Sequence, residues 1–147
     1  MKNNVIGFLP LALGFFLLDR LTKYLSLALP ETGVFYFPGF GLKLYLNPGL
    51  AFSLPMPLEL IAGLIIIILI TLIIVWAKWY QEEKFFLLWP LSLIILGALS
   101  NLLDRFKFGA VIDFIDLWLW PAFNLADIYI VAGCLWLLVK LLPKESK

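Results

Sequence analysis

Histidine is missing from this chain, and cysteine occurs only once, at Cys134. A single cysteine excludes an internal disulfide, and without histidine it also excludes the ordinary zinc and iron–sulfur sites. Charged residues are scarce too: they make up 14% of the 147 residues, against roughly a quarter in soluble domains. The net charge of +1 gives no bulk attraction for nucleic acid. We therefore expect no metal, no cofactor and no nucleic-acid partner.

Apolar residues fill most of the remaining sequence. They make up 63% of the chain, and the mean hydropathy is +1.02. Four apolar segments stand out, each close to the ~20 residues that a helix needs to cross ~30 Å of hydrocarbon. Backbone groups inside a lipid bilayer must be paired within their own segment, which favours helices. The sequence predicts a single-domain, all-α membrane protein over residues 1–147, with four transmembrane helices at about residues 5–29, 60–77, 85–103 and 125–142.

The basic residues predict which side of the membrane each connection faces. Lysines flank the start of the chain, the connection between the second and third segments, and the end of the chain: Lys2, Lys78, Lys84, Lys140, Lys144 and Lys147. We expect these regions and both termini to be cytoplasmic, in a multi-pass membrane protein. Residues 30–57 and 104–124 then form two extracytoplasmic loops.

The first of these loops contains a strand-like pattern. Leu42, Leu44 and Leu46 alternate with more polar residues, and a turn signal at residues 47–49 follows. Strict alternation is typical of a strand with one buried face. We expect a small sheet-like platform between the first and second helices, resting on the membrane surface.

Carboxylates are concentrated in one short stretch. Four of the five aspartates lie between residues 101 and 127: Asp104, Asp113, Asp116 and Asp127. Asp113 is surrounded by large apolar residues, which is not typical of a solvated loop. Asp127 follows Asn124 near the start of the fourth helix, where it either caps the helix or belongs to a site. Asp116 is interpreted as an exposed loop acid.

Further polar residues lie near the predicted outer boundary. Asp19 and Lys23 are four apart and share one helix face, so they form either a simple ion pair or the support of a site. Asn101 lies one turn before the predicted end of the third helix and needs a partner. Asp104 and Arg105 either form an ordinary polar helix end or reach partners in other segments, because adjacent residues do not face each other on a helix.

Two carboxylates that meet in a site of low dielectric cannot both ionise. One keeps a proton, so the pair offers an acid and a base near neutral pH. Such a pair can activate water for attack on a peptide carbonyl without a metal, a thiol or an imidazole. Only thirteen residues separate Asp113 from Asp127, and we expect their side chains to meet.

Five short motifs together resemble the lipoprotein signal peptidases, also called signal peptidase II or prolipoprotein signal peptidase. They occur in the family's order and span most of the chain, and they are specific in combination rather than singly. The motifs are DRLTK at residues 19–23, NPGLAFS at 47–53, GALSNLLDR at 97–105, VIDF at 111–114 and WPAFNLAD at 120–127.

The resemblance implies a membrane aspartyl endopeptidase of the bacterial cell (inner) membrane, with an extracytoplasmic active site and a small extracytoplasmic β-cradle between the first and second helices. Such an enzyme cuts prolipoproteins just before a diacylglyceryl-modified cysteine. By motif position, Asp113 and Asp127 match the catalytic pair. The remaining matches are substrate-binding or supporting positions: Asp19, Lys23, Asn47, Asn101, Asp104, Arg105 and Asn124. The partners implied are prolipoprotein substrates and the lipid bilayer, and we expect a monomer.

Four residues depart from the family pattern: Arg20, Pro48, Leu50 and Ser100. None is a position of the catalytic pair, and their effect on substrate preference is left open by the sequence.

Three rival functions remain at this stage, one of them a structural or assembly membrane protein in which these residues only cap helices. A serine–lysine protease would use Ser53 or Ser100 with Lys23 or Lys43. A small transporter or channel would instead spread its carboxylates through the depth of the membrane.

Overall fold

The computed structural model describes residues 3–49 and 56–142, with side chains from residue 10 onward. This part of the chain folds into long helices and one small antiparallel sheet. In chain order the elements are α1 (Asn3–Ser26), β1 (Val34–Phe37), β2 (Phe40–Asn47), α2 (Leu58–Gln81), α3 (Phe85–Phe108), β3 (Val111–Leu117), β4 (Trp120–Phe123) and α4 (Leu125–Leu141).

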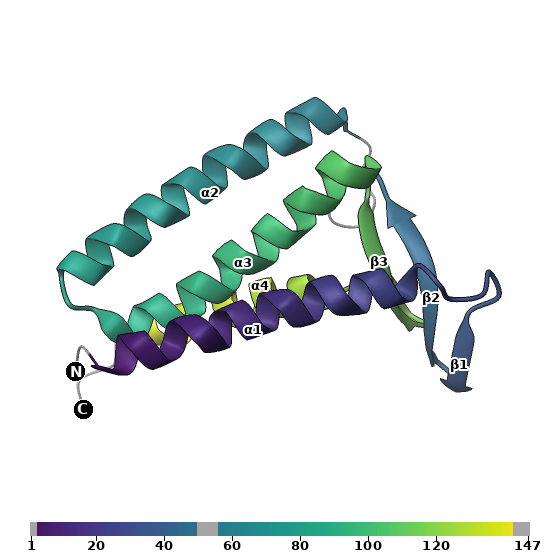
Figure 1. Cartoon of the computed structure of the whole chain (residues 1–147), viewed down its shortest axis with the longest axis horizontal. Coiled ribbons are helices and arrows are strands. Elements are labelled where there is room, and N and C mark those ends of the chain that lie inside the picture. The colour runs from purple at the N-terminus through teal and green to yellow at the C-terminus, as the bar shows by residue number, and fades with distance from the viewer. Residues whose placement is uncertain (1–2, 50–55, 143–147) are drawn as a thin grey trace.

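The helices run lengthwise and the sheet crosses one end of them (Figure 1). The beginning of α1, the end of α4 and the connection from α2 to α3 all lie at the opposite end. α3 contacts each of the other three helices and carries the largest set of buried residues. The two segments expected to share one side of the membrane therefore lie at one end of the molecule.

Two of the helices, α2 and α3, are long and apolar enough to cross a membrane by length and composition within the described residues. Only 17% of the most apolar window of α2 is buried, whereas 56% of that of α3 is buried. An apolar helix with so little burial presents a large greasy surface to its surroundings, as expected for contact with lipid. The other two helices, α1 with three charged residues and α4 with 17 residues in all, are not among the helices that meet this criterion.

The third helix is longer than predicted. It was expected to end near residue 103, but α3 continues to Phe108 and ends at Gly109. Gly109 has φ 70°, the left-handed conformation that commonly ends a helix, and its N–H donates to the Arg105 carbonyl. Asp104 and Arg105 stay helical because their side chains reach partners in other segments, as the next subsection describes.

Two glycines allow α3 and α4 to approach closely. A Cβ atom at Gly97 would lie 2.6 Å from the Ala126 carbonyl oxygen, and one at Gly133 would lie 2.6 Å from the Pro90 carbonyl oxygen. Real Cβ atoms do not come so close to backbone oxygens, so neither position accommodates a side chain without a shift. The close approach fixes the first turn of α4 against α3.

The sheet differs from the predicted cradle. Its strand order is β1-β2-β3-β4, all antiparallel, so half of it comes from residues 104–124 rather than from the connection between the first two helices alone. The expected strand around residues 42–46 is confirmed as β2, which ends at Asn47. We interpreted 104–124 as a loop because its aspartates obscured a run rich in β-branched and aromatic residues. In the structure β3 is a central strand whose first four residues are buried.

Candidate active site

Asn124 lies at the centre of the polar site and is fully buried. It is the N-cap of α4: its side-chain oxygen accepts from the Asp127 N–H at 3.0 Å, and its own N–H donates to Asp127 Oδ2 at 3.1 Å. This is a capping box with aspartate in the third helical position. Its side-chain nitrogen points the other way and donates to Asp113 Oδ1 at 2.8 Å. One residue therefore connects both predicted catalytic acids.

Asp113 lies on β3, opposite Tyr45 of β2, and is 3% exposed. Besides the bond from Asn124, it accepts a hydrogen bond from Asn47 Nδ2 at 3.1 Å. Burial, reinforced by the negative charge of Asp127, raises the pKa of the Asp113 carboxyl to about 6. The bonds from Asn47 and Asn124 oppose that rise. The pKa of Asp113 therefore lies close to the pH range in which a carboxyl can both give and take a proton during a reaction.

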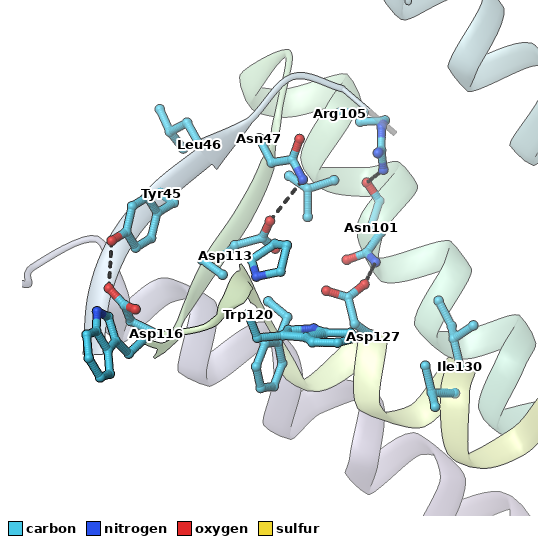
Figure 2. Close-up of a pocket in the computed structure, with 16 residues that line it drawn as sticks. Tyr45, Leu46, Asn47, Asn101, Arg105, Asp113, Asp116, Trp120, Asp127 and Ile130 are labelled. Atoms are coloured by element: carbon cyan, nitrogen blue, oxygen red, sulfur yellow. Dashed lines mark hydrogen bonds between the residues drawn. The ribbon is translucent and has the colours of Figure 1, made fainter. Parts of the chain in front are cut away.

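Asp127 lies in the first turn of α4 and faces the same cavity (Figure 2). Its Oδ1 accepts a hydrogen bond from Asn101 Nδ2 at 2.8 Å, and its Oδ2 accepts the Asn124 N–H. The capping interpretation of Asp127 is therefore confirmed, and the same residue also lines the cavity, while its membership of a catalytic site stays a prediction. Its charge acts on Asp113, so the two carboxyls are electrostatically coupled.

A buried lysine lies behind the two acids. Lys23 is 0% exposed, and its Nζ has three acceptors: Asp104 Oδ2 at 2.7 Å, Asn101 Oδ1 at 2.7 Å and Asp19 Oδ2 at 3.2 Å. An ammonium has three N–H donors, so this one is fully satisfied. Lys23 joins two carboxylates to the amide that holds Asp127.

The two carboxylates paired with Lys23 also hold the backbone beside the candidate acids. Asp19 Oδ1 accepts from the N–H of Ala126, the residue before Asp127, at 2.8 Å. Asp104 Oδ2 accepts from the N–H of Ile112, the residue before Asp113, at 3.4 Å. The polar group on α1 and α3 is therefore fastened to both elements that carry the acids.

Arg20 completes this buried network and was not selected as a site residue from the sequence. Its Nη1 donates to Asp104 Oδ1 at 2.6 Å, and to the Ser100 hydroxyl and carbonyl oxygens at 3.0 and 3.2 Å. The Ser100 hydroxyl in turn donates to Asp19 Oδ2 at 2.5 Å. Two departures from the family pattern, Arg20 and Ser100, are thus in direct contact. Two cations and two carboxylates balance in charge, which lets Asp19, Lys23 and Asp104 lie buried among the helices, while the Arg20 side chain stays 26% exposed.

Arg105 forms part of the cavity wall. Its Nη2 donates to the Gly49 carbonyl at 2.8 Å and its Nη1 to the Asn101 carbonyl at 3.4 Å. Among the described residues, its buried Nε has no hydrogen-bond partner. The guanidinium therefore brings positive charge and a spare donor to a cavity that contains carboxylates.

The cavity has a volume of about 780 Å³. It brings together Asp113, Asp127, Asn47, Asn101 and Arg105, while Asn124 lies fully buried beneath them and contacts both acids. Asp19, Lys23 and Asp104 are buried behind the cavity rather than lining it. The stretch 50–55, which includes Leu50 and Ser53, lies outside the described residues, and Pro48 is exposed.

One residue was interpreted wrongly. Asp116 was expected to be an exposed loop acid, but it lies on β3, is half-buried and lines the cavity. Tyr45, which the sequence analysis did not select, donates its hydroxyl to Asp116 Oδ2 at 2.6 Å. The register of β2 and β3 shifts between Leu42 and Tyr45. That irregularity lies beside the segment that separates Asp113 from Asp116, and local sequence periodicity does not reveal it.

Comparison with known proteins gives a consistent result. The family model described as signal peptidase (SPase) II matches residues 11–143. A lipoprotein signal peptidase from Moorella thermoacetica is 37% identical over 143 residues, which cover 92% of each chain. One from Syntrophus aciditrophicus is 35% identical and covers 100% of this chain and 99% of that protein. A solved structure of a bacterial membrane enzyme superposes with a TM-score of 0.81 at 26% identity, covering 96% of this chain and 93% of the other.

Proposed function

The chain belongs to the signal peptidase II family of bacterial membrane enzymes, whose members remove signal peptides from prolipoproteins, and we propose that Asp113 and Asp127 are its catalytic pair. The observation that carries this proposal is the position of Asn124. It donates its side-chain N–H to Asp113 and its backbone N–H to Asp127. A buried carboxyl, Asp113, and a partly buried one, Asp127, coupled on one cavity are the arrangement that an aspartic peptidase needs.

The reaction follows from one proton shared by the pair. The ionised carboxylate takes a proton from a water molecule as the water oxygen attacks the carbonyl carbon that precedes the modified cysteine. The protonated carboxyl donates to the carbonyl oxygen as the tetrahedral intermediate forms. When the C–N bond breaks, the carboxyl that received the water proton donates it to the leaving amine of the cysteine, and the other carboxylate takes back a proton from a hydroxyl of the intermediate as the carbonyl re-forms. The pair ends the cycle with one proton, as it began.

The surrounding polar residues hold this pair in place. Asn47, Asn101 and Asn124 donate to the two acids and fix how each carboxyl faces the cavity. Arg105 has a donor without a partner among the described residues and lines the same space. It would bind a carbonyl oxygen of the substrate backbone, which the chemistry of a guanidinium favours.

The network behind the site bears on how α1 crosses a membrane. Charged residues within a span are costly unless they are paired. Asp19, Arg20 and Lys23 are all paired with each other or with α3. This pairing supports the proposal that α1 and α4 cross the bilayer beside α2 and α3 in one domain, giving four spans.

The distribution of charge supports an orientation. Lys78 and Lys84 flank the connection between α2 and α3, at the end of the bundle away from the sheet (Figure 1). We assign that end to the cytoplasm with both termini, and the sheet and cavity to the extracytoplasmic face of the cell membrane. The sheet is then the cradle. The proposed mechanism uses residues of one chain only, and we propose a monomer.

The rival interpretations fit the geometry less well. In a transporter, carboxylates would be spread along the helices, but Asp104, Asp113 and Asp127 gather at the sheet end. A serine–lysine protease needs a lysine beside its serine, whereas the Ser100 hydroxyl donates to Asp19. Ser53 lies outside the described residues.

The test is cleavage of a diacylglyceryl-modified precursor peptide by purified protein in lipid. Asp113→Asn and Asp127→Asn preserve shape and remove the ionisable group, so each should lower kcat by about 10³-fold or more. Glu31→Gln is the matched control, because it removes an exposed acid near the sheet that does not line the cavity. Cleavage at the wild-type rate by either aspartate variant would exclude this pair as the catalytic one.

A further inference from the structure

A further carboxyl, that of Asp116, lies at the end of the cavity away from α4. Asp116 and Tyr45 both line the cavity, and Figure 2 shows them on the strands, away from Asp127. The Tyr45 hydroxyl holds one Asp116 oxygen at 2.6 Å. The bond to Asp116 raises the pKa of Tyr45, so the phenol stays a donor. The other Asp116 oxygen has no hydrogen-bond partner among the described residues.

Asp116 forms no ion pair with a lysine or arginine within the described part of the chain. The nearby Lys43 lies with its Nζ 5.6 Å from the centre of the Tyr45 ring instead. Asp116 is oriented by Tyr45, lines the cavity and has one oxygen available. It is therefore suited to accept a hydrogen bond from a donor that enters the cavity, or to pair with a cation there.

The two ends of the cavity face different parts of the molecule. Ile130 and Val131 of α4 line it on the helix side, whereas Tyr45 and Asp116 line it on the sheet side. The signal segment of a prolipoprotein is apolar and belongs with the helices. The polypeptide that leaves the membrane after the cleavage site must then pass over the sheet.

We propose that Asp116, oriented by Tyr45, is a specificity-determining residue that binds the first residues of the mature segment and favours a positively charged side chain there. This rests on the proposed function of the cavity and extends it to one class of substrate. Lysine or arginine shortly after the modified cysteine would be attracted by the free Asp116 oxygen. Glutamate or aspartate in that position would be repelled.

The experiment compares two diacylglyceryl-modified peptides that differ only in lysine or glutamate two residues after the modified cysteine. The readout is the ratio of their kcat/KM values, lysine over glutamate. Wild type should give a ratio of roughly fivefold at low salt, in the range expected for one half-buried charge interaction. The ratio should fall toward one as ionic strength rises, because salt screens such a pair.

Three variants separate recognition from general damage. Asp116→Asn should bring the ratio close to one. Tyr45→Phe keeps the charge but frees the carboxyl, so its ratio should fall between those of wild type and Asp116→Asn. Glu31→Gln should keep the wild-type ratio.

A wild-type ratio of one at low salt would overturn the proposal without any variant, and so would an unchanged ratio in Asp116→Asn. Neither result bears on the catalytic pair. That assignment fails instead if Asp113→Asn cleaves both peptides at the wild-type rate.

Discussion

Replacing Lys23 with methionine tests whether the buried charge network holds the site together. The ammonium is 0% exposed and bonds Asp104, Asn101 and Asp19. Methionine fills similar space but leaves two buried carboxylates with only the Arg20 cation. Removing one partner of a buried ion pair typically costs about 3–5 kcal/mol, because the remaining charge is uncompensated. At about 2–4 °C per kcal/mol, the thermal midpoint should fall by roughly 6–20 °C.

The assay is thermal unfolding of purified protein in one detergent, with cleavage measured below the midpoint. Lys78→Met is the matched control: Lys78 is 69% exposed and lies 3.9 Å from Glu82, so its loss should hardly move the midpoint. Adding Asp19→Asn to Lys23→Met removes the excess negative charge and should recover part of the loss.

Equal midpoints for Lys23→Met and Lys78→Met would refute the reasoning. So would a double variant that loses the full sum of the two single effects.

Three further predictions concern the site itself. The pKa of Asp113 is raised to about 6, chiefly by burial, so its carboxyl keeps a proton below that pH and loses it above. As the pH rises, kcat/KM should therefore decline with an apparent pKa near 6. The decline in kcat should have a higher apparent pKa, because bound substrate excludes more water from the carboxyl. Asn124→Asp keeps a helix-capping side chain but replaces the hydrogen-bond donor to Asp113 with a third carboxylate. The rate of cleavage should fall about 10²-fold or more, while circular dichroism should show an unchanged helical signal. Near-normal cleavage would contradict the bridging role of Asn124. Gly97→Ala places a Cβ 2.6 Å from the Ala126 carbonyl and should cost about 1–3 kcal/mol in thermal unfolding and reduce cleavage, whereas Gly63→Ala, with nothing within 4 Å, should not.

The two acids were predictable because each has a local signature. Asp113 lies among large apolar residues, and Asp127 follows an asparagine at the start of an apolar segment. A buried carboxylate is costly, so its presence in such a sequence indicates a purpose. The same argument identified Asp19 and Lys23, whose helical spacing places them on one face. The ion pair is confirmed and Lys23 also reaches α3, whereas support of a catalytic site by these residues stays a prediction.

The contacts that could not be predicted are the long-range ones. Arg20 meets Asp104 across 84 positions of the chain, and no local pattern encodes that pairing. The same holds for Tyr45 and Asp116, which are 71 positions apart. Strand β3 was missed because its aspartates obscured a run rich in β-branched and aromatic residues, and because pairing with β2 and β4, which no local pattern encodes, completes it as a strand. Helix ends were likewise set by tertiary partners, since Asp104 and Arg105 remain helical.

The central claim is that Asp113 and Asp127 share a site closely enough for the charge of one to hold a proton on the other. The most direct measurement is the titration of the Asp113 carboxyl by carbon-13 NMR, with the signal assigned by its loss in Asp113→Asn. In wild type we predict a pKa near 6. In Asp127→Asn it should fall, yet stay above the usual 3.8, because burial remains when the neighbouring charge is gone. An Asp113 pKa that does not change on removal of the Asp127 charge would contradict the account.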